Sequence, residues 1–108
     1  MTLIEAMACA LPVIATDWGG HTALLAEDDS YPLQIRGLVP AVSRCPYYDG
    51  FSWADPDPGH LAQLMRHVYE NRPEAAARGL RAAARVRSTL SWKQTARAIV
   101  NRLEQVGA

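Results

Sequence analysis

The sequence predicts a mixed α/β fold that forms part of a domain with a parallel sheet. A helical stretch at residues 2–10 precedes a brief, uncharged, β-favouring run at residues 13–15, and a turn cluster and further helical turns follow. Helix, strand, turn and helix in this order are typical of a βαβ-type fold. Because the run at 13–15 is short and does not alternate, we expect a strand covered on both faces, as in a parallel sheet.

The first half of the chain predicts short elements. Leu3, Ala6, Met7 and Ala10 recur at helical spacing, and Pro12 follows just past the expected helix end. After the first strand we expect, in order, a turn at 16–20, one or two helical turns at 22–26, a polar loop at 27–30, a strand at 31–36 that Pro32 confines to a sheet edge, a second short strand at 38–42 and irregular chain at 43–52.

The second half predicts helices with clear start signals. Asp57 followed by Pro58 is typical of an N-cap and a first-turn proline. Pro73 opens a second helix that runs to about residue 89, and Ser91 with Gln94 fits a capping box. Two apolar stripes follow the helical period: Leu61, Leu64, Met65, Val68 and Tyr69 in the first helix, and Trp92, Ala96, Ile99, Val100, Leu103 and Val106 as the expected buried face of the last.

The composition is that of one globular domain of 108 residues, 49% of them hydrophobic and 20% charged. The 11 basic and 11 acidic side chains cancel, so charge gives no reason to expect nucleic acid or an anionic membrane surface as a partner. Arginines are frequent in the last third of the chain, and we expect them to form a solvated face rather than a binding patch. They are Arg72, Arg78, Arg81, Arg85, Arg87, Arg97 and Arg102.

No apolar run reaches the length of a membrane span, and the start of the chain has no secretory signal pattern. Cys9 and Cys45 make no disulfide framework, so we expect a reduced, cytoplasmic setting, with Cys9 a small buried thiol in the first helix. The three histidines and two cysteines show no metal-ligand spacing. Trp53 and Trp92 are interpreted as packing anchors rather than as platforms for sugar rings.

The stretch TLIEAMACALPVIATDWGG resembles the nucleotide-sugar-binding segment of retaining glycosyltransferases with the two-domain GT-B fold, the group 1 glycosyl transferases. FSWADPDPGHLAQLMRHVYENRPEAA and LSWKQTARAIV resemble the C-terminal helices of that family. The resemblance implies that residues 1–108 are the C-terminal half of a Rossmann-like donor-binding domain. The family's first motif glutamate would lie eight residues before Glu5, outside the chain, so we expect a fragment of a longer transferase.

The resemblance assigns Glu5 to the ribose hydroxyls of the donor. The residues themselves agree, because Thr2 and Leu3 sit where free backbone N–H groups and the helix dipole favour a diphosphate. A plainer alternative is that Glu5 complements the positive helix end and is solvated. Ala10 stands where the family has glycine, and it is strained if that position is left-handed.

Gly19 and Gly20 match the family's turn at the end of the strand, and His21 follows at the same edge of the expected cleft. A role in the turn alone is at least as good an interpretation of the two glycines as ligand contact. A single histidine in a turn is more often structural than functional, so His21 is only a candidate. The paired carboxylates Asp55 and Asp57 need no catalytic role, because Asp57 is explained as a cap.

The resemblance implies transfer of a sugar from a UDP-, GDP- or ADP-sugar to an acceptor, with retention of anomeric configuration and no metal needed for donor binding. No catalytic residue falls within the chain, and we expect the chain to be inactive alone. An alternative of another class is a truncated, non-catalytic assembly module that forms homo-oligomers through exposed sheet edges. A non-catalytic nucleotide-binding module is a third interpretation.

Overall fold

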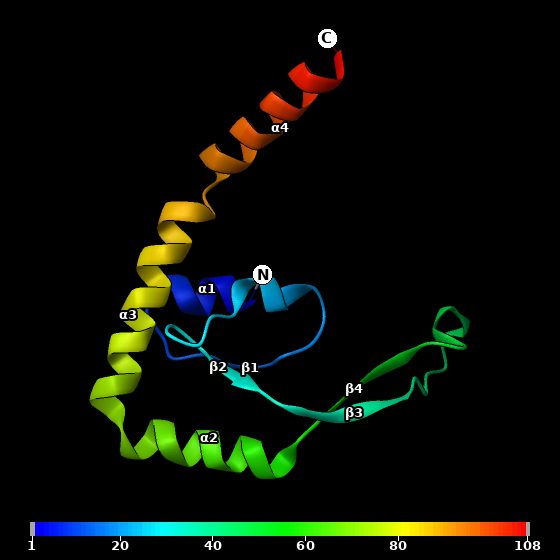
Figure 1. Ribbon diagram of the computed structural model, residues 1–108, viewed down its shortest axis with the longest axis vertical. Coiled ribbons are helices and arrows are strands. Elements are labelled where there is room, and N and C mark those ends of the chain that lie inside the picture. Colours follow the sequence, from blue (N-terminus) through cyan, green and yellow to red (C-terminus); the bar gives the residue numbers. More distant parts are fainter. Residues whose placement is uncertain (1, 108) are drawn as a thin grey trace.

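A computed structural model describes residues 2–107 (Figure 1). Its elements in chain order are α1 (Thr2–Ala8), β1 (Ile14–Thr16), the 3-10 helix η1 (Gly20–Leu24), β2 (Tyr31–Leu33), β3 (Ile35–Pro40), the 3-10 helix η2 (Pro46–Tyr48), β4 (Ser52–Pro56), α2 (Pro58–Glu70), α3 (Arg72–Thr89) and α4 (Trp92–Gly107). The chain is a mixed α/β structure with two small sheets, a parallel pair and an antiparallel pair.

The parallel pair of β1 and β2 confirms the predicted parallel strand, although β1 is shifted by one residue. Ile14 of β1 lies opposite Tyr31 of β2. Side chains alternate between the faces of a strand, so Ala15 packs into the core beside α1 while Ile14 faces α2 and α3. Figure 1 shows α1 and α2 on opposite sides of this pair, which explains why the strand carries no polar face.

A cluster of buried apolar residues lies between α1, β1 and α3. Met7, Val13, Ala82 and Val86 form this core, and Leu3 is among the partly buried side chains packed against it. The small side chains of α3 allow α1 and the loop after it to approach closely. A Cβ placed on Gly79 would lie 2.2 Å from the carbonyl oxygen of the loop residue Ala10. The core is therefore fixed by backbone contact as well as by side-chain burial.

The end of α1 is a Schellman motif, two residues earlier than predicted. The N–H of Leu11 donates to the carbonyl of Ala6 over 3.1 Å, and the N–H of Ala10 donates to Met7 over 2.9 Å. The motif places Ala10 in the left-handed region, with a φ of 59°. Ala10 is therefore strained by about 1 kcal/mol. Cys9 is exposed rather than buried as predicted, because it lies beyond the last residue of the helix.

Replacing Ala10 by glycine is expected to raise the free energy of unfolding by about 0.5–1 kcal/mol, because the left-handed strain exceeds the entropy that glycine adds to the unfolded chain. Urea denaturation followed by circular dichroism measures the change. Ala84→Gly on the exposed side of α3 is the matched control, and it is expected to cost about 1 kcal/mol. Equal destabilisation by both changes would contradict the strain at Ala10.

The strand predicted at residues 31–36 divides at Gln34 into strands of two different sheets. β2 pairs with β1, whereas β3 pairs with β4 in an antiparallel hairpin. The prediction missed β4, because Pro46 and Gly50 made the preceding segment look irregular up to the start of that strand. Arg36 forms an ion pair of 2.7 Å with Asp55 across the hairpin, which accounts for this carboxylate without catalysis.

The predicted helix starts are confirmed in α2 and partly confirmed in α4. The side chain of Asp57 accepts hydrogen bonds from the N–H groups of Gly59 (2.8 Å) and His60 (3.1 Å). The Oγ of Ser91 accepts from the N–H of Gln94 over 3.3 Å. The reciprocal half of the capping box is replaced by another contact, because the Gln94 amide donates to the carbonyl of Ser88.

Three of the arginines in α3 do not form the solvated face that was predicted. Arg78, Arg81 and Arg85 are three and four residues apart, so they lie on one face of the helix. Their guanidinium groups donate to the segment 24–30, where the acceptors are the carbonyls of Leu24, Glu27, Asp28 and Ser30 and the carboxylate of Asp29. The prediction was wrong because the acceptors lie about 50 residues earlier in the chain and carry no local signal.

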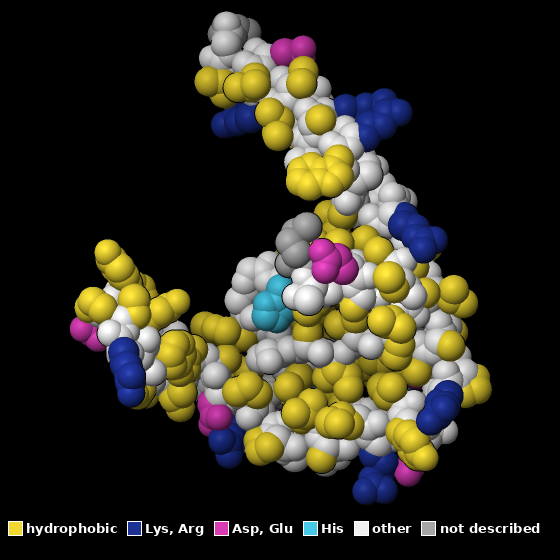
Figure 2. Space-filling view, turned by 180° about the vertical axis from the view of Figure 1, so that it is seen from behind, with side chains coloured by type: hydrophobic (Ala, Val, Ile, Leu, Met, Phe, Trp, Pro, Cys, Tyr) yellow, Lys and Arg dark blue, Asp and Glu magenta, His cyan; other side chains and the backbone are white. Residues whose placement is uncertain are grey.

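The predicted buried face of the last helix is exposed. Trp92 is 84% exposed and Leu103 is 65% exposed. Figures 1 and 2 show α4 leading away from the body, with hydrophobic side chains gathered along one of its sides. The amphipathic pattern was read correctly, but no element among residues 2–107 covers that face. Trp92 is therefore not a packing anchor within the described structure.

Candidate functional site

The predicted donor-binding residues lie on the first turn of α1. Thr2 and Glu5 are exposed, whereas the side chain of Leu3 packs toward the core. The first N–H groups of an α-helix have no partner within the helix, so the backbone here offers donors. Glu5 forms no ion pair within residues 2–107. A free carboxylate and free backbone donors therefore occur together on this turn.

The predicted cleft-edge residues follow the carboxyl end of β1. Gly19 has φ 88° and ψ −170°, a conformation that favours glycine. Gly20 opens η1, and the Nε2 of His21 donates to the carbonyl of Thr16, the last residue of β1, over 2.6 Å. This bond ties η1 back to the strand and gives His21 a structural role. In Figure 1 the start of α1, marked N, lies at the same end of the body as η1.

A polar hollow of about 470 Å³ runs along β2, from Tyr31 at the start of the strand to Gln34 just past its end. Asp17 directly follows β1 and Gln34 directly follows β2, and the N–H of Asp17 donates to Leu33 over 2.8 Å. The carboxyl edge of a parallel sheet is where such folds bind ligands. The residues that line it are Asp17, Glu27, Tyr31, Pro32, Gln34, His60, Leu64, His67 and Arg78.

Sequence reasoning missed this polar hollow, although part of its signal is local. Asp17 and Gln34 could have been found as the residues that follow the two parallel strands. His60 could not have been found in this way, because the β3–β4 hairpin lies between it and Gln34 in the chain and decides where His60 is placed. The Nδ1 of His60 accepts a hydrogen bond from the N–H of Gln34 over 3.1 Å. Neutral His60 therefore carries its proton on Nε2.

The wall of the polar hollow contains a connected polar network between β2, α2 and α3. Tyr31 is buried, and its hydroxyl donates to the carboxylate of Glu74, which also accepts from Arg78. The guanidinium of Arg78 lies 4.5 Å from the centre of the Tyr31 ring, and His67 meets the same ring edge-on at 5.9 Å. Burial, followed by the hydrogen bond and charge of Glu74, raises the pKa of Tyr31 to about 12. The pKa of Glu74 is lowered, mainly by the hydrogen bond that its carboxylate accepts from Tyr31.

The raised pKa of Tyr31 predicts a loss of stability in strong base. Unfolded tyrosine loses its proton near pH 10, whereas folded Tyr31 holds it to about pH 12, so the unfolded chain binds fewer protons in this interval. We expect the free energy of unfolding to fall by roughly 1–3 kcal/mol as the pH rises from 10 to 12. Urea denaturation at a series of pH values measures the fall. The Tyr31→Phe variant should be less stable than the unmodified chain below pH 10, and its free energy of unfolding should not show the contribution of Tyr31 to the fall between pH 10 and 12. A fall of equal size in both chains would contradict a raised pKa at Tyr31.

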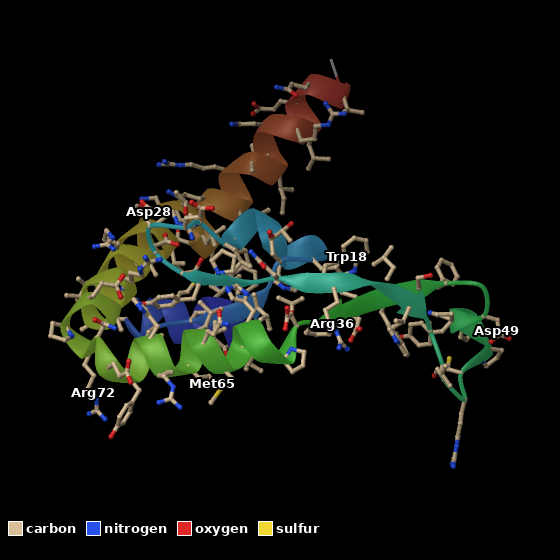
Figure 3. All side chains as sticks on the ribbon, turned by 60° about the horizontal axis from the view of Figure 1, so that its bottom comes forward. Trp18, Asp28, Arg36, Asp49, Met65 and Arg72 are labelled. Carbon is tan, nitrogen blue, oxygen red and sulfur yellow. The ribbon has the colours of Figure 1, made fainter. Side chains whose placement is uncertain are left out.

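A second hollow, of about 500 Å³, lies where the loop after α1 meets α2 and α3. Its lining is Ala10, Pro12, Ile14, Met65, Val68, Tyr69, Arg72, Ala75 and Ala76. In Figure 3, Met65 and Arg72 mark this side of the molecule, well away from Trp18 after β1. With Arg72 its only charged residue, it lacks the convergent polar groups that orient a sugar nucleotide. Of the two hollows, the polar hollow is therefore the better candidate site, although none of its lining residues belongs to α1.

Comparison of the chain with protein-family models, curated proteins and solved structures finds no match. Within residues 2–107, no group of three or more His, Cys, Asp or Glu side chains is placed to hold a metal ion. None of the described helices has both the length and the apolar character needed to cross a membrane.

Proposed function

We propose that this chain is the donor-binding part of a retaining glycosyltransferase with the GT-B fold. In this proposal its small parallel pair belongs to a Rossmann-like domain that takes a UDP-, GDP- or ADP-sugar. The observation that carries the proposal is the exposed Glu5 carboxylate, which has no ion-pair partner among residues 2–107 and stands on a helix turn with free backbone donors. The motif resemblance of residues 2–20 supports it.

The proposed division of roles follows from the chemistry of the first turn. Glu5 would accept hydrogen bonds from the two adjacent ribose hydroxyls, and bonds to a charged group contribute about 1.5–3 kcal/mol each. The N–H groups of Thr2 and Leu3 would face the diphosphate, where the helix dipole favours negative charge. Gly19 and Gly20 would let the backbone approach the donor. The role proposed for the chain itself is binding and orientation of the donor, not turnover.

Calorimetric titration with UDP, GDP and ADP tests the proposal. We expect one of the three nucleotides to bind, and Glu5→Gln to weaken that binding by about 10- to 100-fold, because the neutral amide is a weaker acceptor. Glu104→Gln on the exposed α4 is the matched control and should leave the affinity unchanged. Absence of binding by the unmodified chain, or equal affinity of the Glu5→Gln variant, would refute the proposal.

A second candidate function is assembly with another copy of the chain. Each sheet has two strands, so each strand has one edge without a strand partner among residues 2–107. Such edges pair readily with other chains. Light scattering after size-exclusion chromatography tests this function. A dimer would support it, and a monodisperse monomer across the accessible concentrations would rule it out.

A further inference from the structure

The outer edges of the four strands differ in what their backbone groups can still bind. Just beyond the paired strands of the hairpin, the N–H of Ala41 donates to the carbonyl of Phe51 over 2.9 Å. Along an antiparallel pair, residues alternate between bonding across the ladder and turning their backbone groups outward. The same register continues along the hairpin, so the backbone groups of Ser52 and Ala54 in β4 point away from β3.

Both outer edges of the parallel pair are already occupied in part. On the outer edge of β1, the carbonyl of Thr16 accepts a hydrogen bond from the Nε2 of His21 over 2.6 Å. On the outer edge of β2, Pro32 has no N–H, and the N–H of Gln34 donates to the Nδ1 of His60 over 3.1 Å. A strand added to either edge would therefore have to break a bond or leave a backbone group unpaired.

The two edges of the hairpin differ at a proline. β3 turns the backbone of Leu38 and Pro40 outward, and Pro40 cannot donate because it has no N–H. β4 turns Ser52 and Ala54 outward, and each of these residues has both an N–H and a carbonyl. Among residues 2–107, these groups have no hydrogen-bond partner. β4 is therefore the edge best able to pair with a strand of another chain.

The edge of β4 is complementary to itself. When two copies of β4 run antiparallel, Ser52 of one copy can lie opposite Ala54 of the other, and a two-fold axis at Trp53 repeats the same pair. Each pair exchanges two hydrogen bonds, so every outward N–H and carbonyl of these residues gains a partner. The two Trp53 side chains then lie directly opposite each other, which adds a contact between aromatic rings.

The charge and the position of the hairpin permit this approach. Residues 35–56 contain two arginines and two aspartates, so the hairpin is neutral and two copies do not repel each other. Figure 1 shows the hairpin projecting from the body, and Figure 3 shows Asp49 at its far tip. A hairpin of two strands is at best marginally stable by itself in water, whereas further strands stabilise it. A second copy would therefore complete a sheet that one copy leaves short.

We propose that two copies of this chain associate by pairing their β4 strands antiparallel, with a two-fold axis at Trp53. The result is one sheet in the order β3, β4, β4 and β3, with two strands from each copy. This inference rests on the second candidate function and deepens it, because it names the edge, the direction and the register by which the copies meet.

Sedimentation equilibrium of the full chain tests the proposal. We expect the unmodified chain to form a dimer and Ala54→Pro to raise its dissociation constant about tenfold or more, because proline removes an outward N–H from each copy. Leu38→Pro is the matched control, since Leu38 lies opposite Ala54 in the hairpin and points outward on the other edge. It should leave the dimer unchanged. Circular dichroism establishes that each variant folds.

Oxidative cross-linking gives a readout that does not depend on the proline variants. In the proposed register the Cα atoms of the two Trp53 residues lie about 4.5 Å apart, within the range of a disulfide. With Cys9 and Cys45 replaced by serine, Trp53→Cys should therefore form a covalent dimer. Val39→Cys, which lies opposite Trp53 on β3, should form none.

A monomer at every accessible concentration would overturn this proposal together with assembly as a function. A dimer that both proline variants leave unchanged, or weaken equally, would overturn the pairing of β4 and leave assembly through another surface standing. Cross-linking of Val39→Cys in place of Trp53→Cys would overturn it as well, because the copies would then meet at β3. The donor site is tested separately, since Ala54→Pro should leave the affinity for the nucleotide unchanged.

Discussion

Replacing Arg85 by alanine is expected to lower the free energy of unfolding by about 3–5 kcal/mol. The carboxylate of Asp29 is 3% exposed, and the Nη2 of Arg85 donates to its Oδ1 over 2.9 Å. The same nitrogen donates to the carbonyl of Leu24. Removing the guanidinium leaves a buried negative charge without its partner, and this penalty is larger than the net value of the pair itself. Because a whole domain is stable by only about 5–15 kcal/mol, the variant should be close to unfolding.

Urea denaturation measures this loss, and two further variants separate its causes. Arg66→Ala removes an arginine whose side chain is 78% exposed and is expected to change stability by less than about 0.5 kcal/mol. Asp29→Asn added to Arg85→Ala removes the buried charge and should recover part of the loss. If Arg85→Ala unfolds at the same urea concentration as Arg66→Ala, Arg85 and Asp29 are not a buried pair.

Replacing Gly79 by alanine should destabilise the chain by about 1–3 kcal/mol or more, although alanine is the better helix former. The added Cβ would lie 2.2 Å from the carbonyl oxygen of Ala10 and 2.8 Å from its carbon. Both atoms belong to the backbone, so relief requires the loop after α1 to move away from α3. That movement would open the core between Met7 and Ala82.

Thermal and urea unfolding compare this variant with Gly20→Ala, whose Cβ would meet nothing within 4 Å. The control should remain within about 0.5 kcal/mol of the unmodified chain. A Gly79→Ala chain more stable than the unmodified one would mean that helix propensity outweighs the contact, and that α3 does not approach the loop as closely as the structure shows.

Much of the local structure follows from neighbouring residues and could be predicted. Asp57 and Pro58 fixed the start of α2, because a cap needs only the next three residues. The short apolar run before Thr16 indicated a strand covered on both faces. The predicted turn at Gly19 is confirmed by its positive φ. Glu5 was predicted to stand on the first turn of a helix, and it does.

The contacts that the sequence did not reveal join residues far apart in the chain. Gln34 separates two strands that look like one, and only the choice of partner strand decides the division. His60 reaches the polar hollow because the hairpin returns the chain to β2, which no local pattern encodes. The rings of Tyr48 and Trp53 likewise lie 5.7 Å apart only once β4 pairs with β3.

The sequence by itself determined the positions of the helices, the first parallel strand and the amphipathic face of α4, because these depend on residues within one or two turns of each other. The tertiary structure decided what each face meets. It placed Arg85 against a buried carboxylate, brought the backbone of Ala10 onto Gly79 and left Trp92 exposed. Periodicity encodes which side chains share a face, whereas burial depends on another segment that long-range packing brings to that face.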